Sequence, residues 1–541
     1  MVPAVLLGFQ RRRGSAMSQE GVVGTAARAL LRSRLLAPPS PLAALRLIRE
    51  ARRGGTNPYT LLAVTAIRWP NRAAIVDDDG VWDYRQLQSA TESLAGRLTR
   101  EGVGPGDAVG IMCRNGRGFI AGVFGAALVG ADVVIVNTDF RSDALASAMS
   151  GHRITTMVAD AEFGERAQAA DGSVVVIDPA TITAQEGEPR PNVATPGRII
   201  LLTSGTTGTP KGVPRSPQLR SAVGVWVTIL DRTGLRTGSR ISVAMPMFHG
   251  LGLGMLMLTV ALGGTVLTHR QFDAEAALAQ ASLHRADAFT AVPVVLARIL
   301  ALPERVRARN PVPYLRVVMS SGDRLDPTLG QRFMDAYGDI LYNGYGSTEV
   351  GIGALATPAE LREAPETVGK PVAGCPVRIL DKNGKPVGAR VTGRIFVGGE
   401  LASEGYTGGG DKPGAKAVVD GMTSTGDMGY LDNAGRLYIV GREDDMIISG
   451  GENVYPRAVE NALAQHPAVA DNAVIGVPDE KFGHRLAAFV VLHPDSDTDE
   501  AALREYLKGK VSRFEQPRDI NVVTSIPRNP AGKVVRRELS G

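Results

Sequence analysis

The stretch that decides the fold is Thr203-Ser-Gly-Thr-Thr-Gly-Thr-Pro-Lys-Gly212, which follows the apolar run Ile199-Ile-Leu-Leu202. A short apolar run that opens into Gly, Ser and Thr is typical of a strand that ends in a loop. The glycines let backbone amides approach an anion, the hydroxyl groups add donors, and Lys211 adds a positive charge. Because Lys211 stands between Pro210 and Gly212, this is not the G-x-x-x-x-G-K-[ST] loop of kinases and ATPases. The sequence therefore predicts a loop that binds a polyphosphate.

Length and composition narrow the class of protein. A chain of 541 residues is too long for one ordinary core, so we expect at least two domains. Its two cysteines, Cys113 and Cys375, exclude a disulfide framework and fit a reducing cytoplasm. The seven histidines lack metal-ligand spacing, which argues against a zinc site.

The positive charge is concentrated at the N-terminus. Residues 1–53 contain ten arginines and two glutamates, a net charge of +8, so the rest of the chain carries −3. The basic character is not spread over a folded face, and this argues against nucleic-acid binding. The apolar run 1–7 precedes Arg11-Arg12-Arg13, the reverse of the order in a secretory signal. Leucines alternate with arginines from Arg28 to Arg53, which suits either a basic amphipathic helix on an anionic membrane or a helix packed on the body.

One apolar segment is long enough to suggest a membrane span. Residues 250–268 carry no charge but contain five glycines, and they only just reach the ~20 residues that a span needs. We interpret them as a buried helix and strand that line an apolar cavity.

Alternating helix and strand patterns predict a largely parallel, helix-covered sheet. Strands are expected near 109–113, 133–136, 241–245, 287–292 and 315–320, with helices at 87–98 and 117–129. Residues 368–440 change to short strands and Gly-rich turns, typical of a small antiparallel or barrel-like unit. After Gly441, the charged quartet 442–445 precedes a fresh α/β pattern of about 100 residues, enough for a domain.

Three further polar clusters carry chemistry. Tyr345-Gly-Ser-Thr-Glu349 offers an aromatic ring for a purine, hydroxyl groups for phosphate and a carboxylate for Mg²⁺. In Ser424-Thr-Gly-Asp427 the aspartate can accept both hydroxyl groups of a ribose, and Arg442 can reach a phosphate. In Ile526–Lys533 a lysine on a Gly-supported loop can bring charge to a reacting phosphoryl group.

Together these motifs, in this order and spacing, resemble the adenylate-forming superfamily, which includes acyl-CoA synthetases, peptide-synthetase adenylation domains and firefly-type luciferases. The resemblance covers roughly residues 56–541 and is greatest to fatty-acyl-CoA synthetases. It implies an α/β fold with a large domain of two helix-covered sheets plus a small β-barrel, followed by a mobile α/β lid. The expected divisions are a basic arm at 1–55, an AMP-binding domain at 56–441 and a C-terminal lid at 442–541.

The resemblance also implies two half-reactions. A carboxylate attacks the α-phosphate of Mg-ATP to give an acyl-adenylate and pyrophosphate, and the thiol of coenzyme A then displaces AMP. The expected cofactor is Mg²⁺, and the expected small-molecule substrates are ATP, coenzyme A and a medium- or long-chain fatty acid.

The resemblance assigns roles residue by residue. Catalysis is assigned to Lys533, which should stabilise charge in the adenylation transition state, with Thr206 and Glu349 near Mg²⁺. The nucleotide-binding positions are Thr203, Ser204, Gly205, Thr206, Thr207, Gly208, Lys211, Tyr345, Gly346, Ser347, Thr348, Asp427 and Arg442. The acyl pocket is assigned to His249 and Gly322, the hinge to Asp444, and the coenzyme A side to Gly450 and Gly451.

Two departures from the family pattern stand out. Asp323 lies in Ser320–Leu325, where many relatives have small neutral residues, and Asn529-Pro530 replaces a more usual Thr-rich pair. Rival interpretations are a fatty-acyl-AMP ligase that loads a carrier protein, a ligase for a shorter or aryl acid, and a silent membrane-associated scaffold. A homodimer and peripheral contact with the inner membrane face are further expectations for a cytoplasmic protein.

Overall fold

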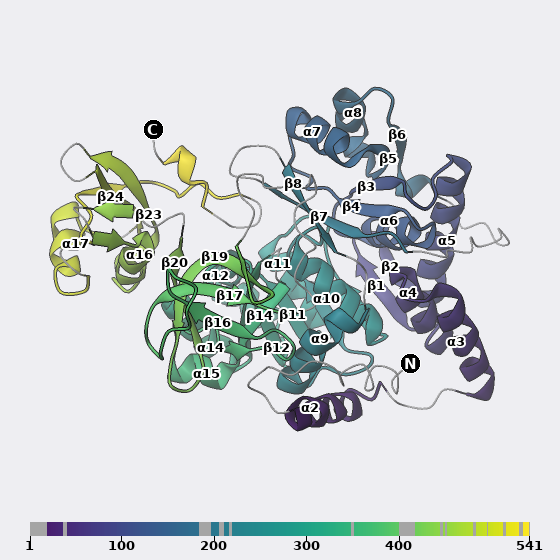
Figure 1. Ribbon diagram of the computed structural model, residues 1–541, viewed down its shortest axis with the longest axis horizontal. Helices are drawn as coiled ribbons and strands as arrows, with labels where there is room; N and C mark the ends of the chain where they lie inside the picture. Colours follow the sequence, from purple (N-terminus) through teal and green to yellow (C-terminus); the bar gives the residue numbers. More distant parts are fainter. Residues whose placement is uncertain are drawn as a thin grey trace.

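The computed structural model describes residues 19–35, 40–182, 196–204, 210–215, 219–347, 351–399, 417–443, 447–449, 452–479, 483–494, 496–511, 515–529 and 534–539. Within these ranges the chain forms four sheets. Two large sheets lie in the body of the molecule, a third lies beside them, and the fourth belongs to a smaller C-terminal unit (Figure 1).

The larger body sheet has the strand order β15-β14-β13-β12-β11-β9-β10-β1-β2 among the described strands. Its strands are β1 (Ala73–Asp77), β2 (Gly80–Asp83), β9 (Arg240–Val243), β10 (Thr265–Leu267), β11 (Ala288–Ala291), β12 (Val317–Ser320), β13 (Leu341–Ser347), β14 (Gly351–Ala356) and β15 (Lys370–Pro371). The central pairings are parallel, and β2, β14 and β15 add antiparallel edges. Central strands such as β12 are buried along their whole length, which accounts for their unbroken apolar runs.

The second body sheet has the order β6-β5-β3-β4-β7-β8 over the described part of the chain. Its strands are β3 (Ala108–Met112), β4 (Asp132–Ile135), β5 (Ile154–Ala159), β6 (Val175–Ile177), β7 (Ile199–Ser204) and β8 (Pro210–Arg215). All its pairings are parallel except that of β7 with β8. The apolar run at 199–202 is therefore a strand, as expected from its sequence.

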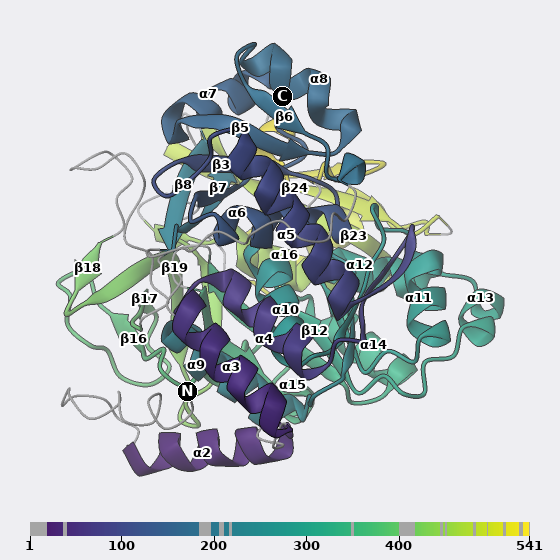
Figure 2. The same ribbon diagram turned by 90° about the vertical axis from the view of Figure 1, so that its right-hand side faces the viewer.

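Helices fill the space between the two body sheets. These are α4 (Pro58–Arg68), α5 (Tyr84–Arg100), α6 (Arg117–Leu128) and α10 (Gly250–Ala261). Helix α6 contacts β3 and β4 on one side and α4 and α5 on the other, while α10 contacts α4, β9 and β10 (Figure 2). One continuous apolar core therefore spans both sheets.

The remaining helices of the body cover the outer faces of the sheets. They are α7 (Ser142–His152), α8 (Ala161–Ala170), α9 (Leu219–Thr233), α11 (Ala274–Leu283), α12 (Pro293–Ala301), α13 (Glu304–Arg309), α14 (Pro327–Tyr337) and α15 (Pro358–Glu363). Both body sheets therefore have helices on each face, the arrangement that parallel strands require.

The uncharged segment 250–268 forms α10 and β10, as predicted. Helix α10 is largely buried, and the hydroxyl group of Thr65 on α4 donates to the carbonyl oxygen of Val260 at 2.9 Å. Core packing between the sheets therefore explains the missing charges along α10, while Thr268 at the end of the segment lines a cavity, as expected.

A third sheet contains β16 (Val377–Leu380), β17 (Gly393–Val397), β18 (Val418–Val419), β19 (Met422–Leu431) and β20 (Leu437–Arg442). All its pairings are antiparallel, and among the described strands no pairing closes a barrel. The change of pattern at 368–440 thus marks an antiparallel sheet.

The C-terminal unit has its own sheet and core. It contains β21 (Ile447–Ser449), β22 (Glu452–Val454), α16 (Pro456–Ala464), β23 (Val469–Asp479), β24 (Gly483–Leu492), α17 (Glu500–Leu507) and β25 (Asp519–Val522). Its apolar side chains form a separate cluster, so this unit buries a core independently of the body.

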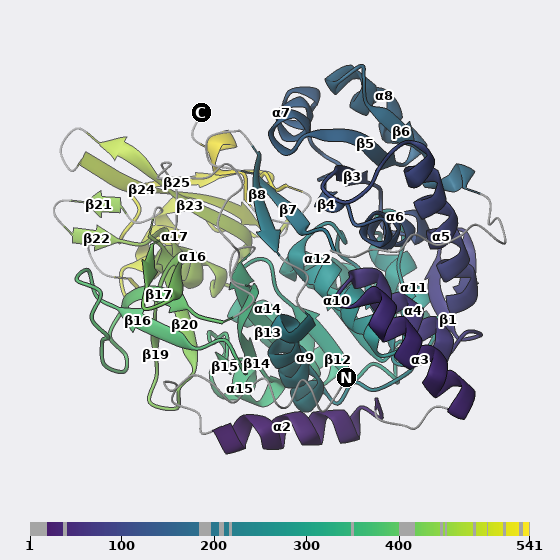
Figure 3. The same cartoon turned by 45° about the vertical axis from the view of Figure 1, so that its right-hand side comes forward.

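The basic N-terminal segment forms two helices packed on the body, α2 (Gln19–Arg32) and α3 (Pro41–Gly54) (Figure 3). A single helix over 28–53 is therefore wrong, because α2 ends at Arg32 and Pro41 begins a second helix. Helix α2 packs on α9, and α3 packs on α4. No helix in the described ranges is long and apolar enough to cross a membrane.

Candidate active site

The carboxyl ends of strands from both body sheets open into one cavity of about 460 Å³. Residues after β3, β4, β9, β10 and β11 line it, and the C-terminal unit adds Arg528 and Asn529. Ligands of parallel α/β sheets bind in such crevices because the loops of several strands converge there. The cavity is therefore the candidate site for a small molecule.

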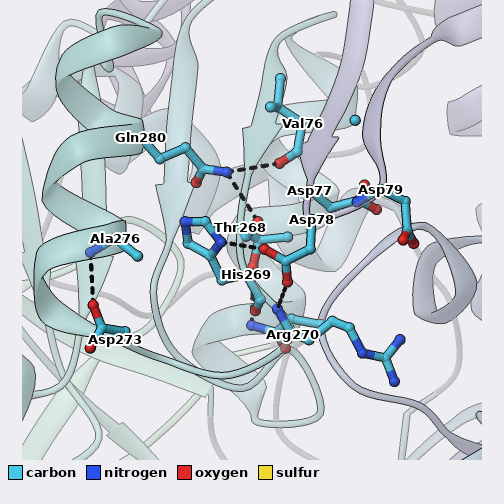
Figure 4. Close-up of polar contacts among 12 residues, drawn as sticks. Val76, Asp77, Asp78, Asp79, Thr268, His269, Arg270, Asp273, Ala276 and Gln280 are labelled. Atoms are coloured by element: carbon cyan, nitrogen blue, oxygen red, sulfur yellow. Dashed lines mark hydrogen bonds and ion pairs between the residues drawn. The ribbon is translucent and has the colours of Figure 1, made fainter.

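His269 lines the cavity and pairs with Asp78, which does not line it (Figure 4). The Nδ1 atom of His269 lies 2.5 Å from Oδ1 of Asp78, and the amide of Arg270 donates to Oδ2 of Asp78 at 2.8 Å. Burial opposes ionisation of Asp78, but the hydrogen bonds from Arg270 and His269 outweigh it and lower its pKa. The Nε2 atom of His269 and the Oε1 atom of Gln280, both buried, have no hydrogen-bond partner within the described ranges.

The cavity is rich in guanidinium groups. Arg114, Arg270, Arg298 and Arg528 all line it. Arg114 forms an ion pair with Glu162 at 2.8 Å, and Arg270 lies 2.9 Å from the same carboxylate. Hydrogen bonds from Arg114 and Arg270 lower the pKa of Glu162, although burial partly opposes them. These cations favour an anionic occupant.

Beside the cavity, the predicted nucleotide residues Tyr345 and Asp427 lie together. Tyr345 on β13 donates its phenol proton to Oδ2 of Asp427 on β19 at 2.5 Å. Burial, followed by the negative charge of Asp427, raises the pKa of Tyr345, so the phenol remains a neutral donor. Arg442 is paired in register with Asp427 across β19 and β20. The hydrogen bond from Tyr345 therefore fixes the orientation of the Asp427 carboxylate.

Two half-buried arginines meet near this carboxylate. Burial, and then the positive charge of Arg324, lowers the pKa of Arg457 to about 10. The Nε atom of Arg457 is buried without a hydrogen-bond partner in the described part of the chain, as are the hydroxyl groups of Ser320 and Ser347. The Nη2 atom of Arg324 also lacks a hydrogen bond there, but it lies 3.9 Å from a carboxylate oxygen of Asp326. Buried donors normally have partners, so this group fits a polar, anionic ligand.

The C-terminal unit supplies part of this arrangement. Arg457 is the second residue of α16, and its charge acts on Arg324 and Asp427 of the body. Arg528 lies 2.8 Å from Asp471 and 3.7 Å from Asp323 of the body. Asp323, which departs from the family pattern, thus has an ion-pair partner in the C-terminal unit. Sequence reasoning missed Arg457 because an arginine after a proline at a helix start carries no signal.

Other predicted residues are placed only in part. Thr203 and Ser204 lie in β7, with Thr203 opposite Lys211 in β8, so two paired strands flank the segment predicted to bind phosphate. The following predicted positions lie outside the described residues: Gly205, Thr206, Thr207, Gly208, Thr348, Glu349, Asp444, Gly450, Gly451 and Lys533.

The predicted acyl-pocket residues border the cavity without lining it. Phe248 lines the cavity. Its ring contacts the ring of His249 in a tilted arrangement, with the centroids 4.6 Å apart. His249 is the residue before α10. Gly322 has φ of +91° and lies next to the side chain of Val292, which lines the cavity. No residue of α10 lines the cavity, so the expected apolar wall is not part of it.

Comparison with known proteins agrees with this geometry. The AMP-binding enzyme family matches residues 62–407, and the AMP-binding enzyme C-terminal domain matches 458–533. The chain is 32% identical to 2-succinylbenzoate–CoA ligase of Bacillus cereus (strain Q1) over 87% of this chain and 95% of that protein. It is also 32% identical to feruloyl-CoA synthase of an Amycolatopsis species, over 87% of this chain and 96% of that protein.

A solved structure shares the fold. The o-succinylbenzoate CoA synthetase of Bacillus subtilis, in complex with its acyl-adenylate intermediate, has a TM-score of 0.79 and 28% identity over 89% of this chain and 98% of that one. The same enzyme has been solved with ATP and a magnesium ion, the substrate and cofactor that such ligases use together with coenzyme A. The chain therefore belongs to the AMP-binding family of adenylate-forming enzymes and is an AMP-forming acyl-CoA ligase.

Proposed function

We propose that this ligase activates a compact aryl or short-chain carboxylic acid, and that the Tyr345–Asp427 pair, together with Arg324 and Arg457, holds the adenylate. The observation that carries the proposal is that buried donor atoms of Ser347 and Arg457, beside that pair, lack a hydrogen-bond partner among the described residues. An ATP or adenylate molecule supplies the acceptors and negative charge that these donors lack.

Within this proposal the nucleotide is held from both sides of the domain interface. Tyr345 lies against adenine, Asp427 accepts the ribose hydroxyl groups, and Arg442 contacts ribose or phosphate. The loop between β7 and β8, with Lys211, holds the β- and γ-phosphates. Among the described residues no group of three His, Cys, Asp or Glu side chains could hold a metal, so Mg²⁺ is assigned to the phosphates together with Thr206 and Glu349.

Lys533 is proposed to stabilise the charge that builds between the α-phosphate and the acyl carboxylate. A mobile cation on the lid suits this role, since it can leave after adenylation. Asp444 is the proposed hinge, and its rotation brings Gly450 and Gly451 to the site for the thioester step. Lys533→Ala should abolish acyl-adenylate formation yet preserve thioester formation from supplied acyl-AMP, and equal loss of both steps would refute this role.

The arginine-lined cavity supports coenzyme A as the acceptor. Arg298 and Arg528 face it beside Arg114 and Arg270, and Arg298 has no ion pair with a described residue. Coenzyme A carries three phosphate groups, whereas the arm of a carrier protein carries one. A cavity lined by several cations therefore favours coenzyme A as the acceptor. A ligase that loads a carrier protein remains the alternative acceptor to test.

The packing of α10 supports a compact acid. Helix α10, the main part of the uncharged segment that suggested a fatty-acyl tunnel, packs on α4 and β9 and does not line the cavity. The two relatives above are named for aromatic acids, succinylbenzoate and ferulate. A medium- or long-chain fatty acid is the second candidate, because Phe248, Val292 and Val295 give the cavity an apolar side.

The test is pyrophosphate release over a panel of aryl, short-chain and long-chain acids, with and without coenzyme A. We expect aryl or short acids to give the highest kcat/KM and acyl-CoA to form only with the thiol present. Preference for long-chain acids would refute the proposed acid class, and adenylate formation without thioester would refute coenzyme A as the acceptor.

A further inference from the structure

Helix α3 has one face on the body and one face in solvent. The body face carries Ala43, Leu47, Glu50, Ala51 and Gly54, positions at helical spacing that are buried or half-buried. It packs on α4 closely enough that a Cβ added at Gly54 would meet Thr60. The start of the helix is set locally by Pro41 and by the side chain of Ser40, which accepts from the amide of Ala43. The orientation of the solvent face is therefore fixed.

The solvent face has an unusual composition for a water-exposed helix. Leu42, Leu45 and Ile48 are 62%, 68% and 52% exposed. Three such side chains at i, i+3 and i+6 form one continuous row along the helix. An apolar row of this kind on a monomer marks an interaction surface.

A parallel row of cations accompanies the apolar row. Arg46, Arg49 and Arg52 are all exposed, and each lies one helical turn after a member of the apolar row. None of the three has an ion pair or hydrogen bond with any described residue. The acid of the helix, Glu50, is on the buried face.

From these two rows we propose that α3 docks the enzyme on an anionic phospholipid membrane. The aliphatic row enters the boundary between headgroups and acyl chains, and the guanidinium groups bind lipid phosphates and serine carboxylates. The charge distribution supports this orientation: residues 1–53 carry +8 and the remainder −3, so an anionic surface attracts the arm and repels the body.

The same rows argue against a second copy of the chain as the occupant. A two-fold contact across α3 would bring the arginine row against its own copy without a compensating carboxylate. The face is also separate from the candidate cavity, whose lining contains no residue of α3. Docking therefore leaves the active site open.

The experiment is co-sedimentation of the full chain with vesicles of phosphatidylserine and phosphatidylcholine, compared with phosphatidylcholine alone. Wild-type protein should bind the anionic vesicles and dissociate at high salt. The Arg46→Gln/Arg49→Gln/Arg52→Gln variant should bind roughly a hundredfold more weakly, because each basic residue near the surface contributes about fivefold. The Leu42→Ser/Leu45→Ser/Ile48→Ser variant should also lose binding to the anionic vesicles.

The matched control is Arg305→Gln/Arg309→Gln/Arg332→Gln, which removes the same charge from exposed positions on α13 and α14. It should bind like wild type, and all variants should retain wild-type pyrophosphate release with a soluble acid. The proposal is overturned if the control loses as much binding as the α3 variants, or if the α3 variants bind like wild type. A change in oligomeric state with vesicle binding unaltered would instead identify a second copy as the occupant and overturn it.

Discussion

Replacing Tyr345 with phenylalanine tests the nucleotide site most directly. The phenol donates to Asp427 at 2.5 Å, and phenylalanine keeps the aromatic face while removing that donor. The proposed ribose-binding carboxylate then loses the contact that orients it. A hydrogen bond to a charged group contributes about 1.5–3 kcal/mol, so we expect the KM for ATP to rise by roughly ten- to a hundredfold.

The magnitude depends on the phenol being protonated. Burial and the adjacent carboxylate raise the pKa of Tyr345, so it stays a neutral donor throughout the neutral pH range. The effect of the substitution should therefore be independent of pH there. Burial of the ring itself is retained, so the free energy of unfolding should fall by no more than this one hydrogen bond to a charged group, about 1.5–3 kcal/mol.

The assay is ATP–pyrophosphate exchange at saturating acid, together with calorimetric titration of AMP. The matched control is Tyr342→Phe: this tyrosine lies on the same strand, and its hydroxyl group donates to the carbonyl oxygen of Arg232 at 3.0 Å. It should lose about 1 kcal/mol of stability, as expected for a hydrogen bond between neutral groups, while keeping the wild-type KM for ATP. An unchanged KM in the Tyr345 variant, or an equal increase in both, would refute the assignment.

Three further predictions concern stability. Asp77→Ala breaks the buried ion pair that joins β1 to α6 and should lower the free energy of unfolding by about 3–5 kcal/mol, measured by urea denaturation. Gly369→Ala should cost about 3 kcal/mol in the same assay, because φ is +80° and a Cβ would lie 2.2 Å from a backbone nitrogen, whereas Gly388→Ala, in open space, should be neutral. Hydrogen bonds from Arg114 lower the pKa of Glu162 in the folded protein. The ionised carboxylate therefore stabilises the fold above its unfolded pKa of about 4.3, and this stabilisation is lost as the pH falls through the folded pKa. Thermal melts across pH should show a smaller drop in Tm on acidification for Glu162→Gln than for the wild type.

Local signals made much of the fold predictable. The strands expected near 133–136, 241–245 and 315–320 are β4, β9 and β12, displaced by one or two residues at their ends. Apolar runs, capping residues and glycine turns act over a few positions, so their pattern survives in the sequence alone. The ordered motifs likewise led to the family to which the chain belongs. The same pattern was misleading at 28–53, where one expected helix is two, because α2 ends at Arg32 and Pro41 begins α3.

The sequence by itself determined the alternation of strands and helices, the strand at 199–202 that leads into the predicted polyphosphate loop, and the adenylate-forming family. Only the tertiary structure paired Tyr345 with Asp427, 82 residues apart, and brought Arg457 of the C-terminal unit to Arg324 of the body. It also assigned the uncharged segment at 250–268 to the core. The physical reason is that these contacts depend on how the sheets and the C-terminal unit pack, and no local propensity records the partner of a side chain that is distant in sequence.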